Sequence, residues 1–164
     1  MFCLKKSTQF SRRSLLIWIL IIMLGIFVYY PIHSAGFLLF DDDWSIYNNP
    51  YVKSVNFLNS FRFVYYFDYT PLSTFYFSVV NRFFGLDPFY YHLFNVLLHF
   101  INGFLTYLLG RKIFNFTPLT AYLFAAIFII HPMHVESVAW ATEAKDILSV
   151  FFLLVSWLIF FHFN

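Results

Sequence analysis

Three consecutive carboxylates, Asp41, Asp42 and Asp43, are the residues whose types and spacing most suggest chemistry. They follow the first long apolar segment of the chain and precede the second, so a membrane arrangement puts them next to hydrocarbon. Acidic side chains beside hydrocarbon are costly to keep, which favours a functional interpretation. The alternative is a solvated acidic loop without a specific role.

A second group of titratable residues lies near the other end of the chain. It consists of His131, His134, Glu136, Glu143, Lys145 and Asp146. The HxxH spacing could bind zinc if Glu136 or Glu143 were the third ligand. However, there is no HExxH motif, and Pro132 interrupts a regular helical pair, so histidines that cap and pack at a helix end are favoured. Cys3 is alone, which excludes a disulfide framework and a cysteine metal site.

The composition predicts that membrane helices position both groups. Hydrophobic residues make up 61% of the 164 residues, charged residues 11%, and the mean hydropathy is +0.71. A soluble globular domain does not reach these values. The basic residues are dispersed and no RNA-type motif occurs, so no nucleic acid partner is expected.

The expected fold class is an all-α integral membrane protein with about four transmembrane helices. The expected crossings are residues 14–32, 89–109, 119–130 and 147–163. The third reaches only about 18 Å. Either it begins nearer Ile113, or His131 lies inside the outer membrane boundary in a protein-lined recess.

Basic residues set the expected orientation. Those at positions 5, 6, 12 and 13 precede the first crossing, and Arg111 and Lys112 follow the second. By the positive-inside rule, residues 1–13 form a cytoplasmic N-terminus, and both the three aspartates and the second group of titratable residues lie outside. A cleaved signal peptide is the alternative for the first crossing, but its apolar run exceeds the usual core of about 7 to 15 residues, which favours an uncleaved anchor.

The first outer loop is expected to contain one or two amphipathic interfacial helices. Thr70 and Pro71 predict a helix start and Gly85 its end. Its expected apolar face comprises Leu72, Phe75, Tyr76, Val79, Val80 and Phe83, whereas Ser73, Thr74, Ser78, Asn81 and Arg82 fill much of the other side. This helix is too short to span, so it would lie along the interface, with its apolar face in lipid or against the bundle. A weaker helix is predicted over residues 57–65; ordinary packing on neighbouring helices is the alternative for both.

Polar residues of the second crossing recur every three or four positions. They are His92, Asn95, His99, Asn102 and Thr106, which share one helix face. Such a stripe must face protein or a wet cavity, because unpaired polar groups in hydrocarbon are costly. Interhelical hydrogen bonding is the favoured interpretation, and a substrate-lining face is the alternative.

Four sequence blocks then carry a family resemblance. They are FDDDWSIYNNPYV, YTPLSTF, FFGLDPFYYHLFNVLLHFINGFLTYLL and HPMHVESVAWATEAKDILS. In this order they resemble the N-terminal membrane region of glycosyltransferases with C-terminal tetratricopeptide repeats, which are similar to the protein O-mannosyltransferases of the GT-C superfamily. The resemblance covers about residues 37–163 and implies such a transmembrane domain over residues 14–164. Since that family continues for many more crossings, an N-terminal fragment or truncated product is expected.

The resemblance implies transfer of a sugar, such as mannose, from a polyprenyl-phosphate donor to a hydroxyl of a protein or glycan on the outer or lumenal side, without a cofactor. The family's acidic pair corresponds to Asp41 and Asp42 as catalytic residues, with Asp43 as a further substrate-binding acid. A carboxylate can take the proton of the attacking hydroxyl. Direct displacement inverts the anomeric centre, so one base suffices.

The departing phosphate requires cationic or donor groups. Lys145, His131 and His134 are the candidates, and Glu136 and Asp146 complete the substrate-binding set. The sequence departs from the family at Thr70, where a basic residue or histidine is common, so no basic phosphate contact is expected there.

Two other function classes compete with a transferase. A non-catalytic interaction or scaffold protein predicts separated polar groups, and a transporter fragment predicts polar continuity from the His92 stripe to Arg111. A transferase predicts that both outer polar groups converge on one lipid-accessible cavity. The expected location is the bacterial cytoplasmic membrane, or the endoplasmic reticulum membrane of a eukaryote.

Overall fold

Membrane-length helices dominate the structure, a computed structural model that describes residues 11–39, 41–62 and 69–163. Three helical stretches are long and apolar enough to cross a membrane: Arg12–Ser34, Pro88–Lys112 and Ala141–Phe163. A fourth crossing results if Pro118–Ile130 and Pro132–Ala139, which meet at a 46° bend, form one broken span. All regular structure in the described residues is helical, so the predicted all-α membrane fold is confirmed.

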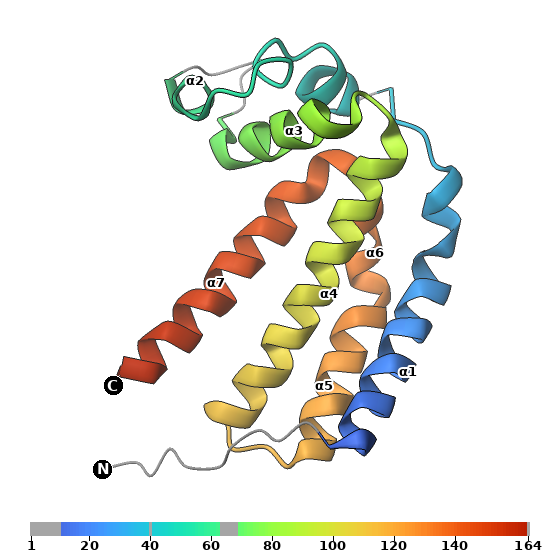
Figure 1. Cartoon of the computed structure of the whole chain (residues 1–164), viewed down its shortest axis with the longest axis vertical. Helices are drawn as coiled ribbons and strands as arrows, with labels where there is room; N and C mark the ends of the chain where they lie inside the picture. Colours follow the sequence, from blue (N-terminus) through green and yellow to red (C-terminus); the bar gives the residue numbers. More distant parts are fainter. Residues whose placement is uncertain (1–10, 40, 63–68, 164) are drawn as a thin grey trace.

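The bundle is built around one central helix, α4 (Figure 1). Its four long helices are α1 (Arg12–Tyr29), α4 (Pro88–Lys112), α5 (Pro118–Ile130) and α7 (Ala144–Phe163). Helix α4 packs along both α5 and α7, and α1 packs against α5. The face of α4 that carries the polar stripe is therefore covered by protein.

Helix α1 is an integral part of this bundle. The Trp18 ring lies 5.4 Å from the Tyr107 ring and 5.8 Å from the Tyr122 ring, so it joins α1 to α4 and α5. Gly25 approaches α4 and α5 so closely that a Cβ there would lie 2.6 Å from a ring atom of Phe100. This packing supports the interpretation of α1 as a retained anchor.

The third crossing begins late and ends early. Thr117 caps α5, its Oγ1 accepting a hydrogen bond from the Thr120 N–H at 3.2 Å, and the helix stops at Ile130, two residues before Pro132. Thirteen residues rise only about 20 Å. Of the two alternatives that the sequence left open, the structure shows the second. His131 lies short of the end of the bundle that the charge distribution predicts to face outward, called the outer end below.

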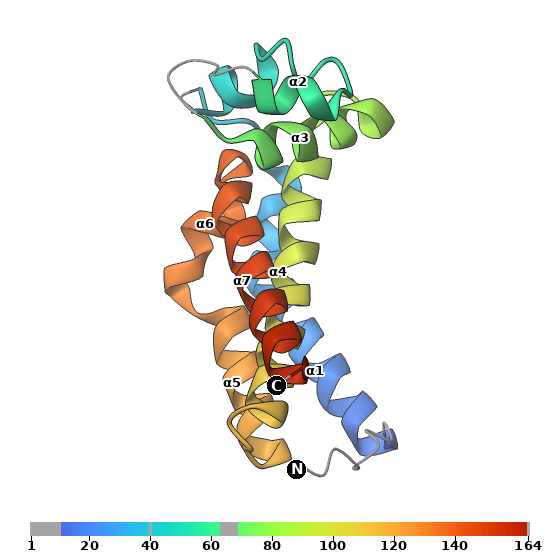
Figure 2. The same cartoon turned by 90° about the vertical axis from the view of Figure 1, so that its left-hand side faces the viewer.

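Three short helical segments continue the chain from His131 to α7. They are η3 (Pro132–His134), α6 (Val135–Ala139) and η4 (Ala141–Glu143). In Figure 2 this connection bends away from the bundle and then rises to its outer end. Breaks in a helix at this depth expose carbonyl groups, which need donors from the protein.

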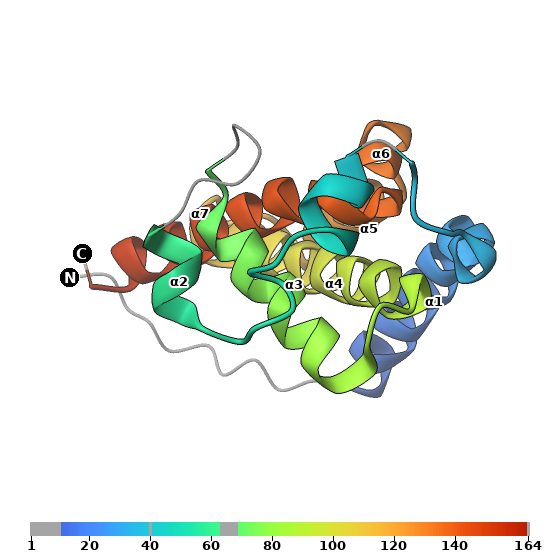
Figure 3. The ribbon, with the colours of Figure 1, turned by 90° about the horizontal axis from the view of Figure 1, so that it is seen from above.

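The loop between α1 and α4 covers the outer end of the bundle (Figure 3). It contains η1 (Tyr30–Ser34), η2 (Asp43–Tyr47), α2 (Phe57–Arg62) and α3 (Pro71–Phe84). The bounds of α3 match the prediction, and residues 63–65 of the weaker predicted helix lie outside the described residues.

The predicted apolar face of α3 is divided between the two environments expected for it, because Val80 packs against the bundle whereas other members of the face are exposed. Ser73 and Ser78 are buried, whereas Leu72 is 42% exposed and Phe83 74% exposed. Small side chains allow close helix packing, so the serines take the covered side and the large apolar residues can meet lipid.

Candidate functional site

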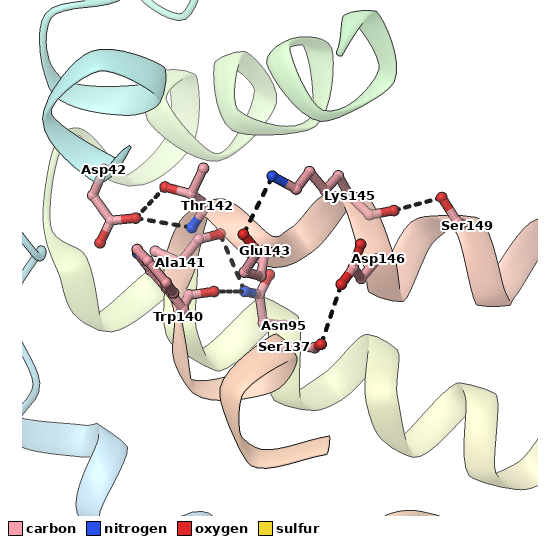
Figure 4. Close-up of polar contacts among 10 residues, drawn as sticks. All are labelled: Asp42, Asn95, Ser137, Trp140, Ala141, Thr142, Glu143, Lys145, Asp146 and Ser149. Carbon is pink, nitrogen blue, oxygen red and sulfur yellow. Dashed lines mark hydrogen bonds and ion pairs between the residues drawn. The ribbon is translucent and has the colours of Figure 1, made fainter. Parts of the chain in front are cut away.

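Asp42 joins the acidic loop to η4, the short segment immediately before α7 (Figure 4). Its carboxylate is fully buried, and its Oδ2 accepts a hydrogen bond from the Leu38 N–H at 2.9 Å. Its Oδ1 accepts two more, from the Thr142 N–H at 2.9 Å and from the Thr142 hydroxyl. Asp42 thus contacts Thr142, which lies 100 residues further along the chain and immediately precedes Glu143 of the second group.

The two neighbouring acids have different surroundings. Asp43 Oδ1 accepts a hydrogen bond from the Asn48 side-chain amide at 2.9 Å within η2. Asp41 is partly exposed, and none of the described residues donates a hydrogen bond to its carboxylate. Of the three consecutive acids, Asp41 thus has the carboxylate oxygens most open to a ligand.

Apolar packing holds this acidic turn in place. Ile46 and Val52 have no exposed surface and pack with Phe77 of α3 and Tyr91 of α4. The position of Asp41 is therefore set by η2, α3 and α4 together.

Asn95 fixes the segment that receives Asp42. Its Nδ2 donates to the carbonyls of Trp140 at 3.1 Å and Ala141 at 3.3 Å, immediately before Thr142. Its Oδ1 accepts a hydrogen bond from the Tyr76 hydroxyl at 3.0 Å. Burial, with a contribution from Tyr91, raises the pKa of the Tyr76 phenol, so the donor stays protonated.

Other residues of the polar stripe also donate hydrogen bonds to backbone carbonyls. His99 Nε2 donates to the Ile129 carbonyl at 3.1 Å, and Asn102 Nδ2 donates to the Ile147 carbonyl at 2.9 Å. Thr106 bonds within α4, to the Asn102 carbonyl at 2.9 Å. Both nitrogens of His92 are buried without a partner among the described residues. Interhelical hydrogen bonding, predicted as the main role of the stripe, is confirmed for Asn95, His99 and Asn102.

The second group of titratable residues is divided between two depths. Lys145 lies near the outer end and pairs with Glu143 at 3.2 Å. His134 lies deeper, with its ring 5.5 Å from the ring of His99 near the middle of α4. This difference in depth agrees with the alternative in which His131 lies inside the membrane boundary, because α5 ends at Ile130, before the end of the bundle is reached.

His134 and Asp146 line one cavity of about 290 Å³. Asp146 accepts a hydrogen bond from the Ser137 hydroxyl at 3.3 Å. His131 and Glu136 are exposed and do not line this cavity. The described residues contain no group of three or more His, Cys, Asp or Glu side chains that could hold a metal ion.

Thr142, Ser137 and Ser149 belong to these sites but were not singled out from the sequence. Ser137 lies in the HPMHVESVAW block, from which only the histidines and the glutamate were predicted as site residues. Thr142 carries no local signal, because its partner is Asp42 at the other end of the chain.

Comparison with curated proteins supports the family resemblance. The chain is 31% identical to protein O-mannosyl-transferase TMTC1 of Mus musculus and 30% identical to that of Homo sapiens, each over 136 residues and 75% of this chain. A protein O-mannosyl-transferase of Caenorhabditis elegans is 29% identical over 93% of this chain. The predicted resemblance to O-mannosyltransferase-like membrane proteins is confirmed.

These relatives are much longer than the present chain. The aligned region covers 14%, 15% and 23% of the three proteins. No family model matches the chain, and no solved structure matches it.

Proposed function

We propose that this chain forms the part of a membrane glycosyltransferase in which the acceptor hydroxyl is activated, with transfer of a hexose such as mannose from a polyprenyl-phosphate donor. The observation that carries the proposal is the contact of Asp42 with Thr142 of η4, beside which Asp41 stays partly exposed. The names of the relatives, protein O-mannosyl-transferases, support the reaction class. The acceptor would be a protein or glycan hydroxyl.

The two acids take different roles in this proposal. Asp41 is the general base, because a base needs a lone pair within reach of the hydroxyl that it deprotonates. Asp42 is a positioning residue, because both of its oxygens already accept hydrogen bonds. Asp43, tied to Asn48, contributes negative charge next to the base.

The reaction is a single displacement. The acceptor oxygen forms a bond to the anomeric carbon as the bond from that carbon to the phosphate oxygen breaks. The proton of the hydroxyl passes to Asp41, and the polyprenyl phosphate departs with the bonding electrons. This route inverts the anomeric centre and needs no covalent intermediate.

A groove between α3 and α7 suits the phosphate of the donor. It has a volume of about 190 Å³ and is lined by the first turn of α3, by Lys145 and, further along α7, by Leu148 and Phe152. The Thr70 side chain does not cap α3, so an anion could take the place of a side-chain cap at the first N–H groups of the helix. The start of α3 could thus bind the phosphate in place of the basic side chain that is common at position 70. Leu148 and Phe152 offer an apolar surface for the lipid chain.

The test compares Asp41→Asn with Asp42→Asn in the full-length product of the gene. Asp41→Asn should lower sugar transfer at least about 100-fold while leaving protein level and thermal stability unchanged. Transfer is measured by mass spectrometry of an acceptor peptide after incubation with polyprenyl-phosphate mannose. Transfer at the wild-type rate in Asp41→Asn would overturn the base assignment. Lys53→Gln, an exposed change in the same loop, is the matched control.

A further inference from the structure

The cavity lined by His134 and Asp146 has no role in the proposed displacement as described so far. It is an open cavity lined by residues of α4, α5, η3, α6 and α7, and its volume of about 290 Å³ is close to the lower limit for ligand pockets, roughly 300 Å³. Its polar lining residues are His99, Asn102, His134, Ser137, Asp146 and Ser149. This lining is unusual at membrane depth, where polar groups are kept for specific contacts.

One polar atom in this lining lacks any partner. Asn102 is 1% exposed, and its Nδ2 donates to the Ile147 carbonyl, but its Oδ1 accepts no hydrogen bond from the described residues. A buried acceptor without a donor costs about 1–3 kcal/mol. Asn102 lines the cavity, so a ligand with a hydrogen-bond donor could satisfy this oxygen after a small shift of the side chain toward the cavity.

Other lining groups also offer acceptors. One oxygen of the Asp146 carboxylate accepts the Ser137 hydroxyl at 3.3 Å, which leaves further lone pairs on an exposed carboxylate at the rim of the cavity. The Ser149 hydroxyl donates to the Lys145 carbonyl at 2.7 Å, so its oxygen can accept. A ligand with several donors fits this arrangement.

The charged and apolar groups that line the cavity favour a sugar over a phosphate or a metal ion. A phosphate would be repelled by the Asp146 carboxylate, and no three-ligand metal cluster occurs among the described residues. A sugar presents several hydroxyl donors together with apolar C–H faces. Phe128, Val138 and Val150 supply the apolar surface for those faces.

We propose that this cavity binds the glycosyl head group of a membrane-embedded glycolipid, held by Asn102 and Asp146. The inference rests on the proposed function in its choice of a lipid-linked sugar. It adds a binding site to that function, one helical turn from the Asp42–Thr142 contact, since Asp146 follows Thr142 by four residues of the chain.

The test uses a photoreactive probe with the full-length protein in phosphatidylcholine nanodiscs. The probe is an octyl mannoside with a diazirine in the alkyl chain next to the sugar; a control probe carries a tri(ethylene glycol) head group on the same chain. Cross-linked peptides are identified by mass spectrometry. We expect labelling of residues 128–138 and 146–150, competed by excess octyl mannoside but not by the glycol compound.

Variants connect the labelling to the cavity. Asp146→Asn keeps the shape of the side chain and should reduce mannoside labelling about tenfold, the effect expected for losing a charged acceptor. Ser137→Ala, a milder change, should reduce it about threefold and remains informative if Asp146→Asn does not fold. Ser156→Ala is the control, because Ser156 is exposed on the same helix and bonds only within it, to the Phe152 carbonyl.

Two outcomes would overturn the inference. One is equal labelling by the glycol probe, and the other is a cross-link that shows another segment of the same protein in the cavity. The Asp41→Asn variant separates the two proposals, because it should lose transfer but keep mannoside labelling. Loss of transfer in Asp41→Asn without cavity labelling of the wild type would refute this inference alone.

Discussion

At the residue scale, Asp41 and Asp42 show how two adjacent carboxylates can differ in role. The difference arises from contacts made far away in sequence, at Thr142. In the sequence the two acids were indistinguishable candidates, because side-chain direction in a short helical turn depends on what packs around it. The burial of Asp42 could therefore not be predicted, whereas the functional importance of the acidic segment could.

The Thr142 hydroxyl should contribute measurably to stability. Thr142→Val keeps the side-chain volume and the backbone donor but removes one hydrogen bond to a buried carboxylate, which should lower the free energy of unfolding by about 1–3 kcal/mol. The measurement is denaturant unfolding in detergent micelles, followed by circular dichroism. Thr120→Val is the control, since it removes an exposed hydrogen bond, to the Thr117 hydroxyl at 2.8 Å, at the opposite end of the bundle.

A double-mutant cycle tests the pairing itself. If Thr142 acts through Asp42, the effects of Asp42→Asn and Thr142→Val should be non-additive by at least about 0.5 kcal/mol. Additive effects would contradict a direct contact.

At the element scale, the prediction succeeded where local signals were strong. Pro71 and Gly85 bracket α3, so both of its ends could be read from the sequence. The face that α3 buries could not, because Ser73 and Ser78 are covered by packing that has no local signature. Likewise, the length of the third apolar run indicated a short crossing, but only the packed bundle decided between an earlier start near Ile113 and a deep His131.

Asn95 should contribute measurably to the stability of the bundle, because its side chain donates to two backbone carbonyls. Asn95→Leu would leave the carbonyls of Trp140 and Ala141 without a side-chain donor and should destabilise the protein by about 1–2 kcal/mol, near the upper range for hydrogen bonds between membrane helices. Unfolding in mixed micelles with increasing dodecyl sulfate measures this. Leu97→Val, an exposed change on α4, should have little effect, and equal loss in both variants would contradict the prediction.

The approach of α4 to α5 depends on Gly103. A Cβ there would lie 2.5 Å from Cγ1 and 2.6 Å from Cδ1 of Ile129. Gly103→Ala should therefore cost about 1–3 kcal/mol, as overpacking does. Gly36→Ala is the matched control, because its Cβ would meet nothing within 4 Å. Thermal unfolding of both variants distinguishes them, and equal midpoints would argue against close helix contact at Gly103.

At the scale of the whole molecule, the two ends of the bundle carry different charges. The start of α1 and the end of α4, with Arg12, Arg111 and Lys112, lie at one end, opposite the acidic loop (Figure 1). This arrangement agrees with the predicted cytoplasmic N-terminus, which stays a prediction.

Cysteine labelling can test this sidedness. In a Cys3→Ser background, Lys53→Cys should react with a membrane-impermeant maleimide in intact cells, whereas Lys112→Cys should react only after permeabilisation. Both lysines are exposed, so accessibility to water is matched. The reverse pattern would invert the proposed topology and place the acidic turn in the cytoplasm.

The short α5 has a consequence for the surrounding bilayer. Its 13 residues cover about 20 Å, whereas the hydrocarbon core is about 30 Å thick, so hydrophobic mismatch arises beside this helix. Beside α5 the bilayer is expected to be locally thinner, with the headgroup layer closer to His131 than elsewhere. This deformation shortens the path that a polar head group travels through hydrocarbon, and the protein should fit thin membranes better than thick, sterol-rich ones.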